Sequence, residues 1–421
     1  MSITRRIVIM GQGYVGLPVS LRAVEAGFDV VGFDVDLERI GTLARGESFI
    51  DDVTSEEMTA ALATGRFLPT TDQADLAGFD VAVVSVPTPL RDGAPDLRFV
   101  EAAADMLAPH LRAGCCVVLE STTYPGTTED VFAPRLEKGS GLSASVDFFV
   151  GYSPERIDPS NPTWTFRNTP KIVAGLGDAA LDAVDEFYSA LVDTTVRVGG
   201  VKEAELAKLL ENTFRHVNIA LVNELAMYAH EFGINIWDVI DAASSKPFGF
   251  MRFSPGPGVG GHCLPIDPSY LSWQVRRALG RAFRFVDLAN DVNDHMPDYV
   301  VTRVMNKLNV ERKALNGSQV LVLGLAYKKN SGDARESPAV AVVQRLVAAG
   351  AEVTVVDPLV PTQYIPDGVS VGRLDHETLL AADVVLVLTD HDELDWALVS
   401  TVAAKVLDTR NRMRIAGAEV L

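Results

Sequence analysis

The chain carries, at residues 6–16, the segment Arg6-Ile7-Val8-Ile9-Met10-Gly11-Gln12-Gly13-Tyr14-Val15-Gly16. Its apolar, β-branched run predicts a strand over residues 6–10, and the three spaced glycines predict a tight turn into a helix. A second strand is expected over residues 29–33, directly before Asp34. Glycines in such a turn let the backbone approach a pyrophosphate, and a helix N-terminus favours the anion. We therefore expect a unit that binds a dinucleotide.

Asp34 indicates which dinucleotide is preferred. A carboxylate at this position accepts hydrogen bonds from ribose hydroxyls and repels an added 2′-phosphate, so NAD is favoured over NADP. Arg39 leaves an alternative open, because a guanidinium can meet a phosphate or stack on adenine. The cofactor contacts expected in this unit are Gly11, Gly13, Tyr14, Val15, Gly16, Asp34 and Arg39.

Three more strands, over residues 81–86, 116–119 and 148–150, alternate with helical segments. This alternation predicts a parallel sheet with helices on both faces. Two polar segments, 85–89 and 120–126, follow these strands at the edge where such sheets bind ligands. Thr88 and Thr122 are thus candidate cofactor contacts, although turn formation explains these segments equally well.

The remaining chain predicts two further regions. Residues 201–231 form one uninterrupted helical pattern, about 45 Å long at 1.5 Å per residue, typical of a spine between domains and of a dimer surface. Strands over 319–324, 351–357 and 383–388 then repeat the N-terminal order. We expect an α/β fold in which two doubly wound Rossmann-like domains are joined by a long central helix and a helical linker domain. The predicted domains are 1–199, 200–312 and 313–421.

The loop over residues 255–267 is rich in glycine and proline and contains Cys263 and Asp267. A thiolate held there can attack an aldehyde. We expect this loop to lie in a cleft between the two Rossmann-like domains. Lys208 and Asn212 lie one turn apart on the predicted spine helix, where a polar stripe on a largely apolar helix needs a polar cavity. Exposed helical lysines are usually solvated, which is the competing interpretation.

The length, charge and composition of the chain argue against several classes of protein. At 421 residues the chain exceeds one typical core, and its net charge of −19 argues against general binding of nucleic acid or anionic membranes. Three cysteines are too few for a disulfide scaffold, and Cys115 and Cys116 are expected to be small core residues. No apolar stretch approaches the ~20 residues of a membrane span, so a cytoplasmic protein is expected. The histidine and cysteine spacing favours no metal site.

These segments together resemble the nucleotide-sugar 6-dehydrogenases, the UDP-glucose/GDP-mannose dehydrogenase family, over essentially the whole chain. The element Gly-Gly-x-Cys-x-Pro-x-Asp, here at residues 260–267, is highly specific to that family. The resemblance implies a four-electron oxidation in which the C6 alcohol of a UDP- or TDP-hexose becomes a carboxylate. Two NAD+ are reduced per sugar, and the enzyme is expected to be a homodimer.

The resemblance also assigns roles. Cys263 is similar to the nucleophile that forms a thiohemiacetal and then a thioester, and Lys208 to the lysine that stabilises the oxyanion. Asn212 resembles the lysine's partner in positioning oxygen or water, Asp267 the aspartate near the thiol, Thr122 the threonine that holds the hydrolytic water, and Glu155 the glutamate of the base and hydrolysis steps. Arg335 is similar to an arginine that reaches the cofactor. The expected substrate contacts are Glu155, Lys208, Asn212, Arg252, Phe253, Gly258, Gly261 and Lys328.

One departure concerns hydrolysis. The UDP-glucose branch has a second glutamate shortly after the Pro-Glu pair, and here that stretch is Arg156-Ile157-Asp158-Pro159. The segments 154–156, 261–263 and 293–297 are more similar to the branch that acts on UDP-N-acetylhexosamines, notably UDP-N-acetylglucosamine. Arg252 replaces the proline common in that branch, so UDP-glucose and TDP-glucose stay open. Two further alternatives are a two-electron hydroxyacid dehydrogenase and a non-catalytic NAD-binding sensor.

Overall fold

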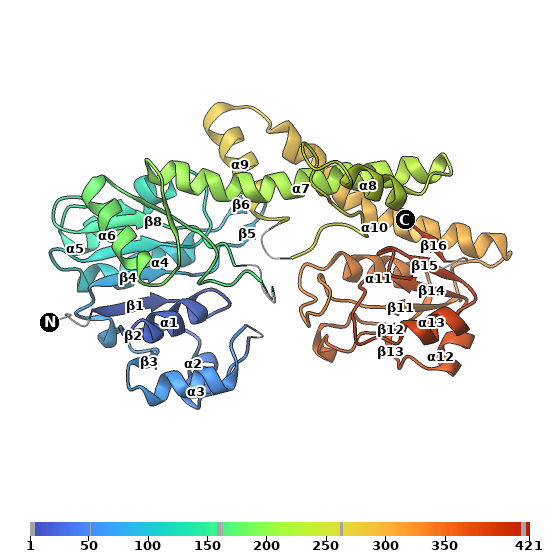
Figure 1. The fold of residues 1–421 in the computed structure, drawn as a ribbon, viewed down its shortest axis with the longest axis horizontal. Helices are drawn as coiled ribbons and strands as arrows, with labels where there is room; N and C mark the ends of the chain where they lie inside the picture. The colour runs from blue at the N-terminus through green and yellow to red at the C-terminus, as the bar shows by residue number, and fades with distance from the viewer. Residues whose placement is uncertain (1–4, 51, 158–160, 162, 262–263, 414–417) are drawn as a thin grey trace. The chain divides into compact units, whose positions relative to one another are not determined.

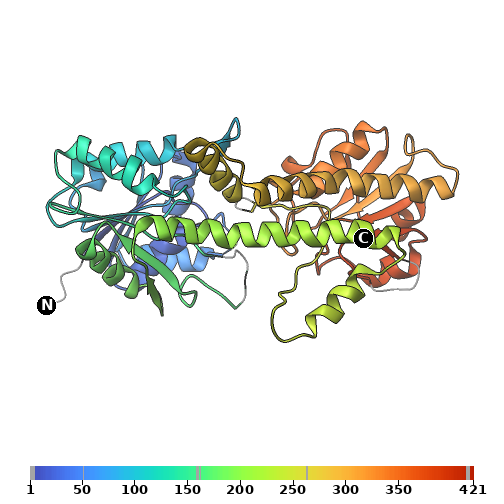
Figure 2. The same cartoon turned by 90° about the horizontal axis from the view of Figure 1, so that it is seen from above.

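The computed structural model describes residues 5–50, 52–157, 161, 163–261, 264–413 and 418–421 (Figure 1). These residues form two compact units. The first contains the chain up to Glu211 together with Trp273–Gly280, and the second contains Asn212–Ser272 and Arg281–Leu421. Helix α7 (Val201–Glu231) belongs to both units, and Figure 2 shows it as one continuous helix.

The first unit is built on a sheet with the strand order β10-β9-β8-β7-β4-β1-β2-β3 in the described residues. Neighbouring strands are parallel except for the β8–β9 pair. The strands are β1 (Arg6–Met10), β2 (Asp29–Phe33), β3 (Phe67–Thr70), β4 (Val81–Val84), β7 (Cys116–Leu119), β8 (Phe149–Tyr152), β9 (Lys171–Gly175) and β10 (Thr195–Arg197).

Helices cover both faces of this sheet because its strands are apolar on both sides. Ile7 and Ile9 of β1 point to one face, and Val8 and Met10 to the other, as the two-residue period of a strand requires. The first face packs on α1 (Gly16–Glu25), α2 (Leu37–Ala44), α3 (Ser55–Ala63) and α6 (Asp178–Ser189), and the second on α4 (Arg98–Leu107) and α5 (Ala133–Ser140). Short elements complete the unit: η1 (Gln73–Leu76), β5 (Leu90–Arg91), β6 (Ala94–Pro95), η2 (Ala108–His110) and the π-helical turn η3 (Thr128–Phe132).

The second unit has its own sheet, with the order β13-β12-β11-β14-β15-β16 and parallel pairing throughout its described strands. These are β11 (Gln319–Leu323), β12 (Glu352–Val356), β13 (Ser370–Val371), β14 (Val384–Val387), β15 (Val406–Asp408) and β16 (Glu419–Val420). One face packs on α10 (Arg284–Val310) and α11 (Pro338–Ala348), and the other on α12 (His376–Ala381) and α13 (Trp396–Val402). The other helices are α8 (Ile236–Ser244), η4 (Thr362–Tyr364) and α9 (Asp267–Leu279). The boundary between the two units falls within α9, after Ser272.

The predicted fold class is confirmed, as are the helix over 201–231 and the strands over 6–10, 29–33 and 116–119. Other strand ends were predicted wrongly by one or two residues. The strand predicted over 81–86 ends at Val84 because the Ser121 hydroxyl takes over the hydrogen bonding of Val86: it accepts from Val86 N (2.9 Å) and donates to Val86 O (2.8 Å). The division into three domains stays a prediction.

The predicted internal repeat has a structural counterpart. Gly11 follows β1 with φ +91°, and Gly324 follows β11 with φ +82°. A Cβ on either glycine would lie 2.2 Å from a backbone oxygen after the neighbouring strand, that of Ser85 for Gly11 and that of Thr389 for Gly324. Both sheets therefore use the same turn, in which no side chain fits.

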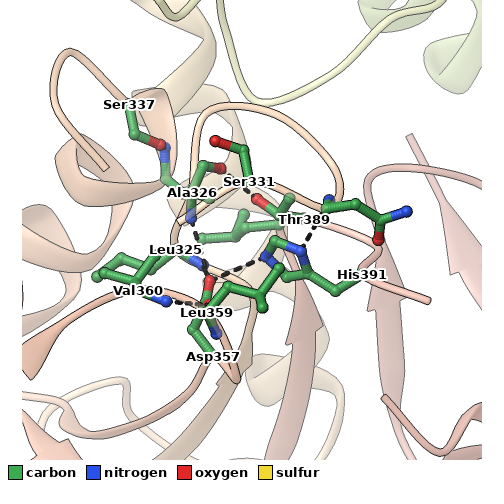
Figure 3. A network of polar contacts seen from close by, with 12 residues as sticks. Leu325, Ala326, Ser331, Ser337, Asp357, Leu359, Val360, Thr389 and His391 are labelled. Carbon is green, nitrogen blue, oxygen red and sulfur yellow. Dashed lines mark hydrogen bonds and ion pairs between the residues drawn. The ribbon is translucent and has the colours of Figure 1, made fainter. Parts of the chain in front are cut away.

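The two copies of this turn differ in the acidic residue that faces it. In the second unit the side chain of Asp357 is 1% exposed and its carboxylate accepts five hydrogen bonds (Figure 3). The donors are the backbone N–H groups of Leu325, Ala326, Leu359 and Val360 and the ring of His391. The other ring nitrogen of His391 accepts from Asn330 N (3.0 Å), which places the ring hydrogen on Nε2. This network fixes both ends of the loop 325–330.

We predict that Asp357→Asn destabilises the protein. The amide would present N–H groups to donors, so the variant should lose about 2–4 kcal/mol of unfolding free energy. Burial alone would raise the pKa of Asp357, but the hydrogen bonds from His391 and the backbone lower it. A lowered pKa gives stability that is present above the unfolded value of about 3.9 and is lost as the pH falls.

Urea unfolding at pH 7 and pH 3 tests this prediction. The gap between wild type and Asp357→Asn should narrow at pH 3. Asp367→Asn, at an exposed loop position, is the matched control and should change little. Equal stability of Asp357→Asn and wild type at pH 7 would contradict the prediction.

Candidate active site

The glycine turn after β1 has the space that a pyrophosphate needs. A Cβ on Gly16, the first residue of α1, would lie 1.8 Å from the Gly11 carbonyl oxygen, so the helix can start this close to the strand only with glycine. A Cβ on Gly13 would meet nothing within 4 Å. Gly13 therefore leaves the open approach to the helix N-terminus that phosphate binding uses.

Asp34 lies at the end of β2, where a ribose diol would meet it. Its carboxylate accepts from Gln12 N (2.8 Å) and Asp36 N (3.0 Å) and pairs with Arg39 (2.8 Å). The Arg39 guanidinium also lies over the Phe49 ring, 5.5 Å from its centroid. Because the Arg39 charge is matched by Asp34, the site favours the uncharged ribose of NAD over a 2′-phosphate. These residues fit NAD.

Thr88 and Thr122 lie in loops that follow the adjacent strands β4 and β7, and both are partly buried. Sequence reasoning missed the residue that secures the second loop. Glu205 of α7 is fully buried, and its carboxylate accepts from Gly126 N (2.6 Å), Thr128 N (2.9 Å) and the Thr128 hydroxyl (2.7 Å). Burial raises the pKa of Glu205 to about 7.

Glu155 follows β8, and its two carboxylate oxygens have different surroundings. Oε1 accepts from the backbone N–H groups of Arg156 (2.6 Å) and Ile157. Oε2 lies 3.5 Å from Lys171 Nζ. The Arg156 side chain turns to Glu211 of α7 (2.6 Å).

Three of the predicted catalytic residues are buried polar groups. Lys208 and Asn212 are 8% and 6% exposed although they lie one turn apart on α7, and Asp267, the first residue of α9, is 3% exposed. The Asn212 side-chain amide donates to Asp267 Oδ2 (2.6 Å). Within the second unit the structure therefore brings Asn212 and Asp267 together. Arg215, three residues after Asn212 on α7, is exposed.

The glycine-rich loop before Cys263 packs against the segment that carries Lys328. Cys263 and His262 lie outside the described residues. A Cβ on Gly260 would lie 2.6 Å from Pro338 Cδ, and one on Gly261 would lie 3.2 Å from the Tyr327 ring. Gly261 N also donates to Glu336 O (3.3 Å). The expected substrate residues Gly258, Gly261 and Lys328 thus come from two segments that lie side by side in the second unit.

A buried asparagine pair supports the start of this loop. Asn223 of α7 is fully buried and accepts from Gly256 N (2.9 Å) while its amide donates to Asn293 of α10 (2.9 Å). A Cβ on Gly258 would lie 3.3 Å from the Asn293 carbonyl oxygen. Sequence reasoning missed Asn223, since a single asparagine in a long helix carries no distinctive spacing.

The other predicted binding residues lie on or near the surface. Arg335 is exposed and forms two hydrogen bonds to Asp333 of its own loop (3.0 and 2.8 Å). Arg252 pairs with Asp241 of α8, and Phe253 packs edge-on against Phe214, with 5.7 Å between ring centroids. Lys328 is partly buried.

Two charged residues near Glu155 were not predicted as site residues. Glu120 follows the apolar strand β7, and Lys171 opens the apolar strand β9. The sequence signal that could have identified them is a charged residue at the end of an apolar strand.

In the described part of the chain, no group of three or more His, Cys, Asp or Glu side chains is arranged to hold a metal ion, and no helix is long and apolar enough to cross a membrane.

Comparison with known proteins identifies the family. Three consecutive family models match: the NAD binding domain of the UDP-glucose/GDP-mannose dehydrogenase family at residues 5–192, its central domain at 202–295 and its UDP binding domain at 321–415. The matched ranges contain the glycine turn, the cysteine loop and the Lys328 segment, in that order.

Individual proteins agree with this match. The chain is 34% identical to a UDP-N-acetyl-D-mannosamine dehydrogenase of Pyrococcus horikoshii over 92% of this chain and 90% of that protein. It is 35% identical to a UDP-N-acetyl-D-glucosamine 6-dehydrogenase of Pseudomonas aeruginosa over 92% and 91%. A solved UDP-D-ManNAc dehydrogenase from Pyrococcus horikoshii superposes with a TM-score of 0.88 at 32% identity, covering 96% of this chain and 95% of that one. The chain therefore belongs to the UDP-glucose/GDP-mannose dehydrogenase family and is an NAD-dependent oxidoreductase.

Proposed function

We propose that this enzyme oxidises the C6 alcohol of a UDP-N-acetylhexosamine, with UDP-N-acetylglucosamine as the first candidate, to the uronate. Two NAD+ are reduced for each sugar. The main support is the burial of three predicted catalytic side chains: Lys208 on α7, and Asn212 with its hydrogen-bond partner Asp267 in the second unit. Burying polar side chains costs free energy, and a catalytic role explains why that cost is tolerated. We also propose a cytoplasmic location.

The sugar is proposed from relatives. Similar proteins are named for UDP-N-acetyl-D-glucosamine and, equally, for UDP-N-acetyl-D-mannosamine. UDP-glucose and TDP-glucose are the next candidates because Arg252 departs from the pattern expected of the N-acetylhexosamine branch. NADH formation by the purified enzyme with each of these sugars, and with GDP-mannose, ranks them.

In the proposed reaction, bound NAD+ is the hydride acceptor. The Lys208 ammonium stabilises the alkoxide that develops at C6 and favours the thiolate of Cys263, since a thiol with an ordinary pKa of about 8.5 is mostly protonated at neutral pH. The thiolate attacks the aldehyde carbon, and the later thioester is opened by water. Asn212, held by Asp267, orients the reacting oxygen, and Glu155 accepts a proton from the water.

Two other functions would use the same cofactor unit. A two-electron hydroxyacid dehydrogenase would have no use for Cys263, and a non-catalytic sensor would bind NAD without turnover. The yield of NADH separates these functions, since it is two per sugar for the proposed reaction, one for the hydroxyacid dehydrogenase and none for the sensor.

We predict that Cys263→Ser abolishes uronate formation because a hydroxyl is far less readily ionised than a thiol and leaves less readily from an ester. Wild type should give two NADH per sugar, and the variant should bind NAD with unchanged affinity. Unchanged uronate production by Cys263→Ser would remove the cysteine from the mechanism.

We predict that Lys208→Ala lowers kcat by about 10²–10³-fold because it removes one charge that stabilises the oxyanion. The Kd for NAD, measured by fluorescence titration, should stay within about twofold, well under the tenfold change that 1.4 kcal/mol would give. Lys202→Ala is the matched control, since Lys202 lies on the same helix but is 49% exposed and paired with Glu129. Equal losses of turnover and NAD affinity in Lys208→Ala would count against its role.

We also propose a homodimer that uses the exposed apolar side chains of α7. These are Leu206, Leu210, Phe214, Leu221, Leu225 and Tyr228. Sedimentation of wild type should give twice the chain mass of 45.3 kDa, and Leu210→Glu should shift the protein toward one chain. A wild-type mass of one chain at micromolar concentration would contradict the proposal.

A further inference from the structure

A buried ion pair lies directly behind Glu155. Lys171 is 3% exposed, and its ammonium contacts Glu120, which is fully buried. The same ammonium lies 3.5 Å from Glu155 Oε2. It also faces the rings of Phe166 and Tyr188, at 5.3 and 5.1 Å from their centroids. One buried cation is thus shared by two carboxylates.

The other groups around the pair are few. The Tyr188 hydroxyl of α6 donates to Glu120 Oε1 (3.2 Å), while Glu120 Oε2 has no hydrogen-bond partner among the described residues. Arg156, next to Glu155, is paired with Glu211 of α7. A small cavity beside Glu155, of about 10 Å3, is lined by Glu155, Arg156, Ile157, Phe166, Thr169 and Lys171. Lys171 is therefore the cation that balances the charge of the Glu120 carboxylate.

Burial alone would lower the pKa of Lys171, but Glu120 and then Glu155 raise it, so the side chain stays an ammonium. Burial raises the pKa of Glu120, and Lys171 opposes that rise. A buried ammonium must keep a counterion, since an unpaired buried charge is strongly destabilising. With Glu120 in place, Glu155 can change its charge while Lys171 stays paired.

We propose that Glu120 and Lys171 are positioning residues that let Glu155 act as the base for thioester hydrolysis. In this way Glu120 compensates, through Lys171, for the second glutamate that is missing after Glu155. The proposal rests on the proposed function, in which Glu155 serves the hydrolysis step. Glu120 is too deeply buried to meet the substrate, so it acts through Lys171 and not by contact.

In the proposed hydrolysis, water opens the thioester with Glu155 as the base. The water oxygen bonds to the thioester carbon, and the C–S bond breaks with its electron pair on the Cys263 sulfur. One water proton passes to Glu155, and the second is lost when the new carboxylic acid ionises. Glu155 Oε1 already accepts two backbone N–H bonds, so Oε2, the oxygen beside Lys171, takes the proton. Glu120 is then the remaining counterion of Lys171.

Replacing Glu120 and replacing Lys171 should shift the pH dependence of kcat in opposite directions. Glu120→Gln leaves Glu155 as the only counterion of Lys171, so protonating Glu155 becomes costly and the acidic limb of kcat should move to lower pH. Lys171→Met leaves two carboxylates without their cation, so the limb should move to higher pH. Each shift should be about one pH unit, as expected for loss of one partly buried charge.

The experiment uses full-length protein and the nucleotide sugar that gives NADH with wild type. The kcat–pH profile and the rapid-mixing burst of NADH are measured for wild type, Glu120→Gln, Lys171→Met and Lys171→Arg. Slower hydrolysis should lower kcat by about tenfold in Glu120→Gln while a burst of two NADH per site appears, as an accumulating acyl-enzyme requires. Lys171→Arg should keep the wild-type limb. Lys202→Met, which removes an exposed lysine, should match wild type throughout.

A purely structural role would lower the melting temperature and leave the limb and the burst unchanged, and that result would overturn the proposal. The proposal would also be overturned if the acidic limb moved in the same direction in Glu120→Gln and in Lys171→Met. If Glu120→Gln does not fold, Glu120→Asp replaces it and should move the limb to lower pH by a smaller amount, and an unmoved limb again overturns the proposal. Wild type that makes no uronate would overturn the proposed function as well, whereas uronate with unmoved limbs overturns this inference alone.

Discussion

Both sheets depend on one backbone contact, the close approach of a glycine after the central strand to a carbonyl after the neighbouring strand. At Gly11 and Gly324 a side chain would lie 2.2 Å from that oxygen, so only glycine lets the strand turn there. Every loop that carries a predicted cofactor contact in the first unit leaves its sheet at this edge. Gly260 in the cysteine loop is also restricted to glycine, because a Cβ there would lie 2.6 Å from Pro338 Cδ and 2.9 Å from the Glu336 carbonyl oxygen.

The two glycine turns differ in the carboxylate beside them. Asp34 accepts from two backbone N–H groups and has the partly exposed Arg39 as its counterion. Asp357 accepts from five donors and stabilises the loop 325–330, which carries Lys328. One turn is thereby suited to NAD, and the other has become a rigid support for the segment that carries Lys328. A carboxylate in a Rossmann-like turn does not by itself indicate a ribose site.

Local signals allowed most of the fold to be predicted. The glycine turn, the apolar strands and the 31-residue helix α7 each have a period or motif within a short window. The supports of the candidate site could not be predicted in this way. Lys171 and Glu120 are 51 residues apart, and Asn223 and Asn293 are 70 apart, so only the folded sheet and helices bring these polar groups together. Strand ends were also missed where a side chain, such as Ser121, replaced the ladder hydrogen bonds.

Buried ionisable side chains stabilise the segments around the candidate active site. Lys171, Glu205 and Asp357 each bind several groups of the segments beside them. In our proposal Glu155 exchanges a proton beside a cation that stays paired. The most direct measurement is intact-mass and peptide mass spectrometry of Glu155→Gln enzyme, acid-quenched during reaction with NAD+ and the sugar that wild type oxidises. The account predicts a covalent uronyl adduct on the peptide that contains Cys263. Uronate formed with that peptide unmodified at every time point would contradict it.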